Sequence, residues 1–250
     1  QIIENFQLVF QNILEKLTKK GYKVLLCIDE VHLTPLLKKL ASVYQIMISK
    51  NLNVSLLMAG LPENVSEIQN NDVLTFLLRA HRIVLNPLDI ESIKESYQHI
   101  FKNAGYQINL KIILYMTKQT LGFAYAFQLL GYHVWNEAQK ESKKEITKQI
   151  IDNILDTYIS DLNRNVYFKV YSEMSQKEKE FVQAMVKANS TKIKSQTIGE
   201  IMHKSANYIA VYRRKLIDDQ VIKPNGYGYV SFLLPHFDKF VEQQMILEDL

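Results

Sequence analysis

The stretch Val24-Leu25-Leu26-Cys27-Ile28-Asp29-Glu30 decides how this chain folds. Four apolar residues surround one cysteine and run directly into two adjacent carboxylates, and His32 follows two residues later. A short continuous apolar run of this kind predicts a buried strand of a parallel sheet. Ligands of open α/β sheets bind beyond the carboxyl ends of the strands, which is where Asp29 and Glu30 emerge. The stretch therefore predicts an acidic site at the end of a buried strand.

Two more short apolar runs follow, at residues 54–59 and 82–85. The residues between these runs show helical periodicity at 34–50 and at about 65–79, and residues 1–19 predict an amphipathic helix ahead of the first strand. Strands that alternate with helices, and that are apolar almost throughout, are typical of a parallel sheet covered by helices. We therefore expect an α/β unit with three parallel strands.

The pattern becomes helical after Pro87 and changes again near residue 165. The middle section predicts helices at residues 88–103, 109–118, 123–139 and 145–160. In the last section, Ser175 and Glu178 form a capping-box pattern that begins a helix at 175–188. It is followed by predicted helices at 196–203 and 205–219 and by predicted strands at 221–223 and 229–232, joined by a Pro224-Asn225-Gly226 turn. Three helices followed by a hairpin predict a winged helix.

Composition limits the class of protein. The 250 residues are 47% hydrophobic and 22% charged, which is typical of a soluble globular protein, and no apolar run is long enough for a transmembrane helix. The single cysteine, Cys27, excludes an intrachain disulfide and fits the reducing cytoplasm. Because the chain begins with Gln1 and has no signal-peptide pattern, we expect it to start inside a longer polypeptide. The segment from residue 187 to residue 223 contains eight Lys and Arg residues but three Asp and Glu residues, so it is locally basic.

The acidic pair suggests nucleotide chemistry. One carboxylate would hold Mg²⁺ through water, and the next would orient and deprotonate a water that attacks a γ-phosphate. However, none of the eight glycines belongs to a G-x-x-x-x-G-K-[ST] phosphate loop. A structural alternative is that Asp29 and Glu30 only cap the following helix, where negative charge is favourable.

Three segments together resemble a known family: the strand with Asp29-Glu30, the run Met58-Ala59-Gly60-Leu61-Pro62, and residues 79–88. Their order and spacing are similar to those of AAA+ ATPases of the replication-initiator (origin-recognition-like) and STAND-related branch. The resemblance implies an α/β plus α fold. It consists of a partial parallel-sheet P-loop ATPase domain at 1–86, a helical lid at 87–162 and a C-terminal winged helix at 163–250.

The same resemblance implies roles for individual residues and for cofactors. Asp29 would be the Mg²⁺-side carboxylate and Glu30 the catalytic base, with ATP and Mg²⁺ as cofactors of the intact protein. Arg79 or Arg82 would act as an arginine finger that reaches the γ-phosphate held by a neighbour in a homo-oligomer. The alternative for either arginine is a surface ion pair. The Walker A loop would lie upstream of Gln1, so we expect the chain as given to bind ATP poorly and to be inactive alone.

Two positions depart from the pattern of the family. Its second strand usually ends in a polar sensor, whereas this chain has Ala59 and Gly60 there. Its lid helix often carries a sensor arginine, whereas residues 122–126 read Gly-Phe-Ala-Tyr-Ala. Both departures argue against efficient ATP hydrolysis, even by the complete protein.

The predicted recognition helix suggests contact with DNA. Ile209 and Leu216 are one heptad apart and are expected to face the core. Asparagine pairs with adenine, while tyrosine, lysine and arginine side chains reach phosphates. The candidate DNA-binding residues on the helix and on the wing are Asn207, Tyr208, Tyr212, Arg214, Lys215, Lys223 and Tyr227. Val211 shares the face of the two tyrosines, and Arg213 lies close to the core stripe. The alternative is a winged helix that serves only in packing or protein interaction.

Two other functions stay open at this level. Asp29-Glu30-Val31-His32 spells the D-E-x-H string of a DEAH-type helicase fragment, although Leu61-Pro62 and the lid argue against it. A non-enzymatic DNA-binding or adaptor protein on a degenerate ATPase scaffold is the second alternative. The six histidines lack the spacing of zinc ligands, and we expect no membrane association.

Overall fold

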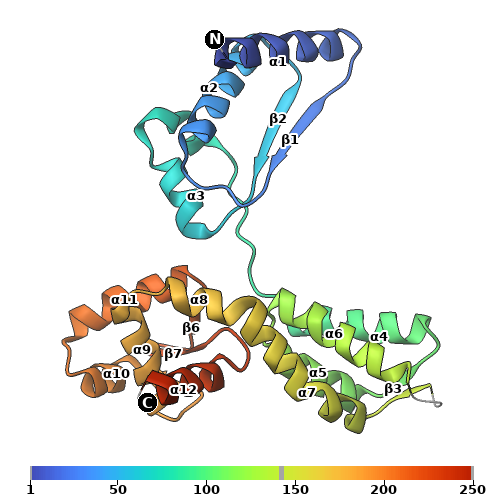
Figure 1. The fold of residues 1–250 in the computed structure, drawn as a ribbon, viewed down its shortest axis with the longest axis vertical. Coiled ribbons are helices and arrows are strands. Elements are labelled where there is room, and N and C mark those ends of the chain that lie inside the picture. The colour runs from blue at the N-terminus through green and yellow to red at the C-terminus, as the bar shows by residue number, and fades with distance from the viewer. Residues whose placement is uncertain (1, 141–143, 249–250) are drawn as a thin grey trace. The chain divides into compact units, whose positions relative to one another are not determined.

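The computed structural model describes residues 2–140 and 144–248. The chain divides into two compact units, Gln1–Val84 and Leu85–Leu250. In the first unit, helices and strands alternate along the chain (Figure 1). Its elements are α1 (Ile2–Lys19), β1 (Val24–Ile28), α2 (Pro35–Ser49), β2 (Val54–Met58), α3 (Pro62–Gln69) and the 3₁₀ helix η1 (Asp72–Arg79).

The two strands form a parallel sheet, in which Val24 pairs with Val54 and Ile28 with Met58. The first strand and its parallel pairing are confirmed. Burial alternates along both strands, so that one face packs on the core and the other is open. The open face carries Leu25, which is 60% exposed, and Leu57, which is 48% exposed. Cys27 is also exposed, so the prediction of a buried strand was wrong for this face of β1.

The third predicted strand, at residues 82–85, does not form. Its apolar side chains Ile83, Val84 and Leu85 are exposed. A strand exists only through hydrogen bonds to a neighbour, and within the described residues β1 and β2 pair only with each other. The predicted helix at 65–79 is also divided, because the chain turns between α3 and η1. The prediction of three parallel strands was therefore wrong for the described chain, which has two here.

The second unit is mostly helical. Its first half comprises α4 (Ile90–Asn103), β3 (Gln107–Ile108), α5 (Leu110–Thr120), α6 (Ala124–Ala138), β4 (Glu145–Ile146) and α7 (Lys148–Leu162). Its second half comprises the π-helical turn η2 (Asn163–Tyr167), α8 (Phe168–Glu173), α9 (Gln176–Lys187), β5 (Ile193–Lys194), α10 (Ser195–Met202), α11 (Ala206–Asp218), β6 (Ile222–Pro224), β7 (Tyr229–Phe232) and α12 (Phe237–Glu248). All four helices predicted between residues 88 and 160 are present, each with slightly shifted ends.

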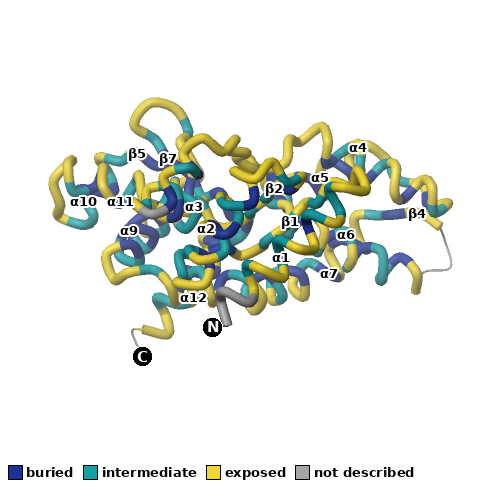
Figure 2. Tube along the Cα trace, turned by 90° about the horizontal axis from the view of Figure 1, so that it is seen from above, coloured by how far each residue is buried: buried dark blue, intermediate teal, exposed yellow. Residues whose placement is uncertain are grey.

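One apolar core runs through this second unit, from Ile93 in α4 to Val241 in α12. Buried positions recur every three or four residues along α7, which gives the helix one core face (Figure 2). The helix continues through η2 into α8 with no linker, so residue 163 lies inside a continuous helical path. The expected division into a lid and a winged helix at this residue stays a prediction.

The C-terminal sheet is antiparallel and has the strand order β5-β7-β6. Strands β6 and β7 correspond to the predicted hairpin, with Lys223 opposite Ser231. The pairing of Ile193 with Val230 adds β5, which was not predicted because two residues carry no periodicity. The predicted capping box is confirmed, since Glu178 and Ser175 bond reciprocally at the start of α9. None of the helices in the described part of the chain combines the length and hydropathy that crossing a bilayer requires.

Candidate functional site

The acidic pair lies in the loop that follows β1, beside the end of β2. The Ala59 N–H donates to the Ile28 carbonyl at 2.9 Å, and the Val31 N–H donates to the Ala59 carbonyl at 2.9 Å. These bonds hold the two strand ends together on either side of Asp29 and Glu30, whose side chains are exposed. The structure therefore presents both carboxylates to solvent at the carboxyl edge of a parallel sheet.

The backbone of this loop has an unusual conformation at Glu30. Its φ is 52°, a left-handed value that is uncommon for a residue with a side chain. The Glu30 N–H donates to Oδ1 of Asp29 at 2.9 Å, and Nδ1 of His32 lies 3.0 Å from the Glu30 carbonyl oxygen. Such conformations cost free energy and cluster at functional sites, so the bend marks this loop as a candidate site.

Gly60 explains part of the departure from the family pattern at the end of β2. A Cβ at this position would lie 2.8 Å from the Val31 carbonyl oxygen and 2.8 Å from its Cγ2. Val31 itself is buried in the core of the unit. The close approach of the two loops therefore leaves no room for a side chain at residue 60.

The two candidate arginines lie elsewhere in the first unit. The guanidinium of Arg82 donates to Oγ of Ser66 at 3.3 Å, and Arg79 is exposed in the last turn of η1. In the part of the chain that the structure describes, no hydrogen bond or ion pair joins either arginine to Asp29 or Glu30. The expected role of either arginine as a finger stays a prediction.

The residues around Asp29 and Glu30 meet only some of the requirements of a site for Mg²⁺ and ATP. Asp29 and Glu30 are exposed carboxylates, which are the oxygen ligands that suit Mg²⁺ held through water. Among the described residues, no group of three His, Cys, Asp or Glu side chains forms a complete metal site. The sequence also contains no phosphate loop, so the expected role of Asp29 and Glu30 as the acidic half of a nucleotide site stays a prediction.

A second candidate surface is helix α11. Ile209 and Leu216 are buried, as expected. The rings of Tyr208 and Tyr212 lie 4.8 Å apart, and both pack against the core. Asn207, Val211 and Arg214 are exposed instead. The seven predicted DNA-binding residues therefore divide between two faces of the helix and the wing.

Lys215 lies on the side of α11 that faces α9. Its Nζ is 3.0 Å from Oε1 of Glu178, whose side chain is only 2% exposed. Burial raises the pKa of Glu178, but the hydrogen bonds from Ser175 and Lys215 outweigh it and hold the pKa below its ordinary value. Lys215 therefore neutralises a buried carboxylate as part of the packing between the two helices.

The remaining candidate DNA-binding residues have exposed side chains. Arg214 is paired loosely with Asp218, at 3.9 Å, and its side chain is mostly exposed. Lys223 is exposed on β6, and Tyr227 is fully exposed on the β6–β7 turn. These side chains, together with Asn207, are available for contact with a partner.

Two further residues of this region, Arg213 and Ser195, were not among the predicted DNA-binding residues. Both line a pocket of about 930 Å³ between α10, α11 and the β6–β7 turn. Arg213 comes one turn after Ile209, a signal that places it beside the core stripe. The spacing in the sequence does not indicate that Ser195 and the glycines at 226 and 228 share this pocket. They come together because β5 pairs with β7.

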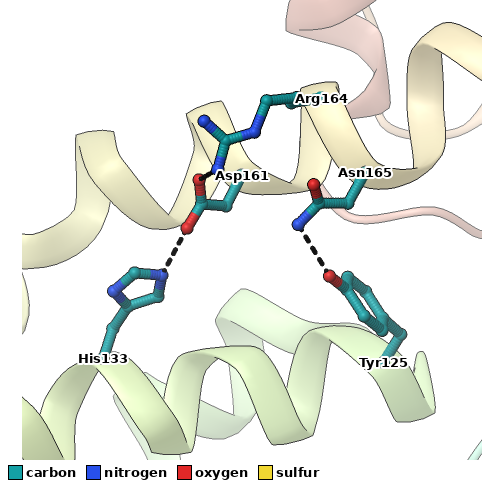
Figure 3. A network of polar contacts seen from close by, with 5 residues as sticks. All are labelled: Tyr125, His133, Asp161, Arg164 and Asn165. Carbon is teal, nitrogen blue, oxygen red and sulfur yellow. Dashed lines mark hydrogen bonds and ion pairs between the residues drawn. The ribbon is translucent and has the colours of Figure 1, made fainter.

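A polar network connects α6 with the end of α7 and η2 (Figure 3). Nε2 of His133 lies 3.0 Å from Oδ2 of Asp161, and Arg164 donates to Oδ1 of the same carboxylate at 2.6 Å. Asn165 donates to the hydroxyl of Tyr125 at 2.9 Å. Tyr125 lies in the segment where the resemblance would place a sensor arginine. Here its hydroxyl accepts the hydrogen bond that links η2 to α6.

Comparisons with known proteins fit this description at the level of the fold. A family model described as a domain of unknown function (DUF8462) matches residues 164–241, which include α9, α10 and α11. No curated protein matches the chain in sequence.

Solved structures that are similar in fold include the following two. One is the Walker-type ATPase PABY2304 of Pyrococcus abyssi, with a TM-score of 0.67 and 10% identity over 94% of this chain and 67% of that one. The other is the Aeropyrum pernix ORC2 protein in ADPNP–ADP complexes, with a TM-score of 0.64 and 8% identity over 94% of this chain and 69% of that one. The chain therefore has an ORC-like AAA+ ATPase fold.

Proposed function

We propose that this chain is the part of an AAA+-type ATPase that carries the acidic pair, a helical lid and a winged helix. In the complete gene product it would bind ATP with Mg²⁺, and the nucleotide state would reposition the winged helix on DNA. The observation that carries the proposal is the exposed Asp29-Glu30 pair at the carboxyl edge of a parallel sheet, in a chain whose fold is similar to that of a Walker-type ATPase.

The open face of the β1–β2 sheet supports the idea that further protein completes the site. Parallel sheets are normally buried on both faces, whereas Leu25 and Leu57 are exposed here. About a third of each matched solved structure has no counterpart in this chain. We infer that a further segment with the phosphate-binding loop covers this face and adds a strand that pairs with residues 82–85.

The proposed roles follow from the position of each residue. Asp29 would hold Mg²⁺ through water, and Glu30 would accept a proton from the attacking water. Arg79 or Arg82 would contact the γ-phosphate bound by a neighbouring copy in a homo-oligomer. The bound nucleotide would supply the phosphoryl group, while this chain's residues would position water and metal.

Contact with DNA would be made by the exposed side of the winged helix. Asn207 and Arg214 on α11, with Lys223 and Tyr227 on the wing, are exposed and suit phosphates and base edges. Tyr208 and Tyr212 pack against the core, and Lys215 is exposed but pairs with Glu178 of α9, so these three residues would act indirectly.

A second function, a non-enzymatic adaptor on a degenerate scaffold, is favoured by one observation. The ion pair of Lys215 with Glu178 uses a basic residue of α11 for packing. Arg214→Met in the complete gene product separates the two functions. A DNA-binding protein would lose affinity and show a shallower dependence of log K on log salt, whereas an unchanged slope would favour the adaptor.

The ATPase function is tested by nucleotide hydrolysis in the complete gene product. Glu30→Gln preserves the size of the side chain but removes the base, and we expect a loss of about 10²–10⁴-fold in kcat with little change in ATP affinity. Glu145→Gln, at an exposed glutamate on the short strand β4, is the control. Equal turnover by the Glu30→Gln variant and the wild type would refute the role of Glu30.

A further inference from the structure

The loop between β1 and α2 contains a histidine to which the proposed function gives no role (Figure 1). His32 follows the acidic pair by two residues, and in the sequence it suggested only a helicase string. Its side chain is exposed, as are those of Asp29 and Glu30. Nδ1 of its ring lies 3.0 Å from the Glu30 carbonyl oxygen. The ring therefore contacts the backbone of the residue proposed as the catalytic base.

The chemistry of this contact assigns the proton on the ring of His32. A carbonyl oxygen can only accept, so the contact is a hydrogen bond when Nδ1 carries the proton and donates it. In a neutral ring, Nε2 is then the acceptor. A histidine ring that meets only water prefers the proton on Nε2. The Glu30 carbonyl therefore selects the less common tautomer of His32.

The backbone of Glu30 needs such support. Its φ of 52° lies in the left-handed region, which is unfavourable for a residue with a Cβ. The N–H of Glu30 donates to Oδ1 of Asp29 at 2.9 Å, and its carbonyl accepts from His32. Both backbone polar groups of the bent residue are therefore held by side chains of neighbouring residues in the loop.

The backbone on either side of the bend is fixed by β2. The Ile28 carbonyl accepts from the Ala59 N–H at 2.9 Å, and the Val31 N–H donates to the Ala59 carbonyl at 2.9 Å. Val31 is buried, and Gly60 packs so closely on it that no Cβ would fit. Because both ends of the bend are held, a change of backbone conformation at Glu30 would redirect mainly the side chains within the bend.

We propose that His32 is a positioning residue for Glu30. The Nδ1–H of His32 holds the Glu30 carbonyl, keeps the backbone left-handed and so aims the Glu30 carboxylate at the attacking water. The inference rests on the proposed ATPase function and adds a residue to its site. Asp29, which would hold Mg²⁺, has no contact with His32, so the contribution of His32 is to kcat and not to the binding of ATP.

Variants that move the donor test the proposal. In the side chain of asparagine the amide nitrogen takes the place of Nδ1, whereas in glutamine it lies farther out, near the place of Nε2. In ATP hydrolysis by the complete gene product, we expect His32→Gln to lower kcat about 10-fold to 100-fold with little change in KM. His32→Asn should retain kcat within about threefold. His99→Gln, at an exposed histidine of α4, is the control.

A second measurement does not depend on activity. Long-range ¹H–¹⁵N correlation spectra of the full chain identify the protonated nitrogen of each histidine ring. At about pH 8, where a histidine ring is ordinarily neutral, the proton of His32 should be on Nδ1. A proton on Nε2 would overturn the proposal, because the Glu30 carbonyl would then have no donor. Thermal unfolding of each variant checks that it folds.

The outcomes separate the role of His32 from the ATPase function. If the complete wild-type gene product does not hydrolyse ATP, the proposed function fails, and the role of His32 fails with it. If the wild type hydrolyses ATP and His32→Gln does so equally fast, His32 does not position the base, although the ATPase function stands. Equal losses in the Gln and Asn variants, or a raised KM with unchanged kcat, would also overturn the proposal.

Discussion

Nζ of Lys215 lies 3.0 Å from Oε1 of Glu178, and this ion pair joins α11 to the first turn of α9. The glutamate is almost completely buried, and it also bonds Ser175 in the capping box. Removing the ammonium would leave a buried carboxylate without its counter-charge. The pair therefore fixes the helix that carries the proposed recognition face.

We expect Lys215→Met to lower the free energy of unfolding by about 1–3 kcal/mol in urea denaturation. Lys177→Met is a matched control, because both lysine side chains are 47% exposed but the partner of Lys177, Glu180, is more exposed than Glu178. The control should lose less than about 1 kcal/mol. Equal losses in the two variants would contradict a special role for Lys215.

The same pair makes stability depend on pH. Since the pKa of Glu178 is lower in the folded chain than its ordinary value of 4.5, its contribution is complete above that pH and is lost as the pH falls through the folded pKa. Acid titration of stability should therefore be less steep for Glu178→Gln than for the wild type. Parallel curves would show that Glu178 does not titrate with folding.

His236 should produce a second pH dependence. Burial, with a smaller effect of Lys239, lowers its pKa below 6.5, and its ring lies edge-on to Tyr158. Because the unfolded chain takes up the proton first, stability should fall as the pH drops below about 6.5.

His236→Asn should reduce that loss, since asparagine tolerates the left-handed φ of 60°. His203→Asn is the control, because His203 also has a positive φ but is exposed. Urea unfolding at about pH 7.5 and about pH 5.5 measures the difference. The prediction fails if both variants keep the full pH dependence of the wild type.

Gly60→Ala should loosen the loop that presents the acidic pair. The added methyl group would overlap the Val31 carbonyl, and such overpacking costs about 1–3 kcal/mol. Hydrogen exchange of the β1 and β2 amides should accelerate accordingly. Ser55→Ala, at an exposed position of β2, should leave exchange unchanged. Normal exchange in the Gly60→Ala variant would mean that the loops separate at little cost.

Cys27 reports whether the open face of the sheet is covered. Its thiol is exposed on that face, so a maleimide should label it rapidly in the native chain. In the complete gene product, we expect mass spectrometry of the Cys27 peptide to show at least about tenfold slower labelling, as burial requires local opening first. Equal rates in both proteins would contradict the covering segment.

Local patterns predicted much of this fold. The apolar runs led to β1 and β2, Ser175 and Glu178 to the start of α9, and the heptad of Ile209 and Leu216 to the buried side of α11. Each of these depends on residues that are near one another in sequence. The fold is similar to that of the Walker-type ATPase and of the ORC2 protein, which agrees with the ATPase part of the resemblance.

Long-range contacts account for the errors. Residues 82–85 are apolar like a strand, but a strand also needs a neighbour to bond. Spacing along α11 predicted that Tyr208, Tyr212 and Lys215 share a side, but only the position of Glu178 on α9 shows what that side contacts. Arg213 and Ser195 line one pocket because β5 pairs with β7. Strand β5 has two residues, and so short a strand has no periodicity that would predict this pairing.

Calorimetric titration with ATP and Mg²⁺ tests the central claim most directly, because it compares the acidic half of the site with the complete site. We predict that the complete gene product binds Mg²⁺–ATP and that Asp29→Asn weakens this binding. We also predict that the chain of residues 1–250 alone gives no binding heat. A tight, Mg²⁺-dependent ATP complex of this chain alone, or no nucleotide binding by the complete gene product, would contradict the account.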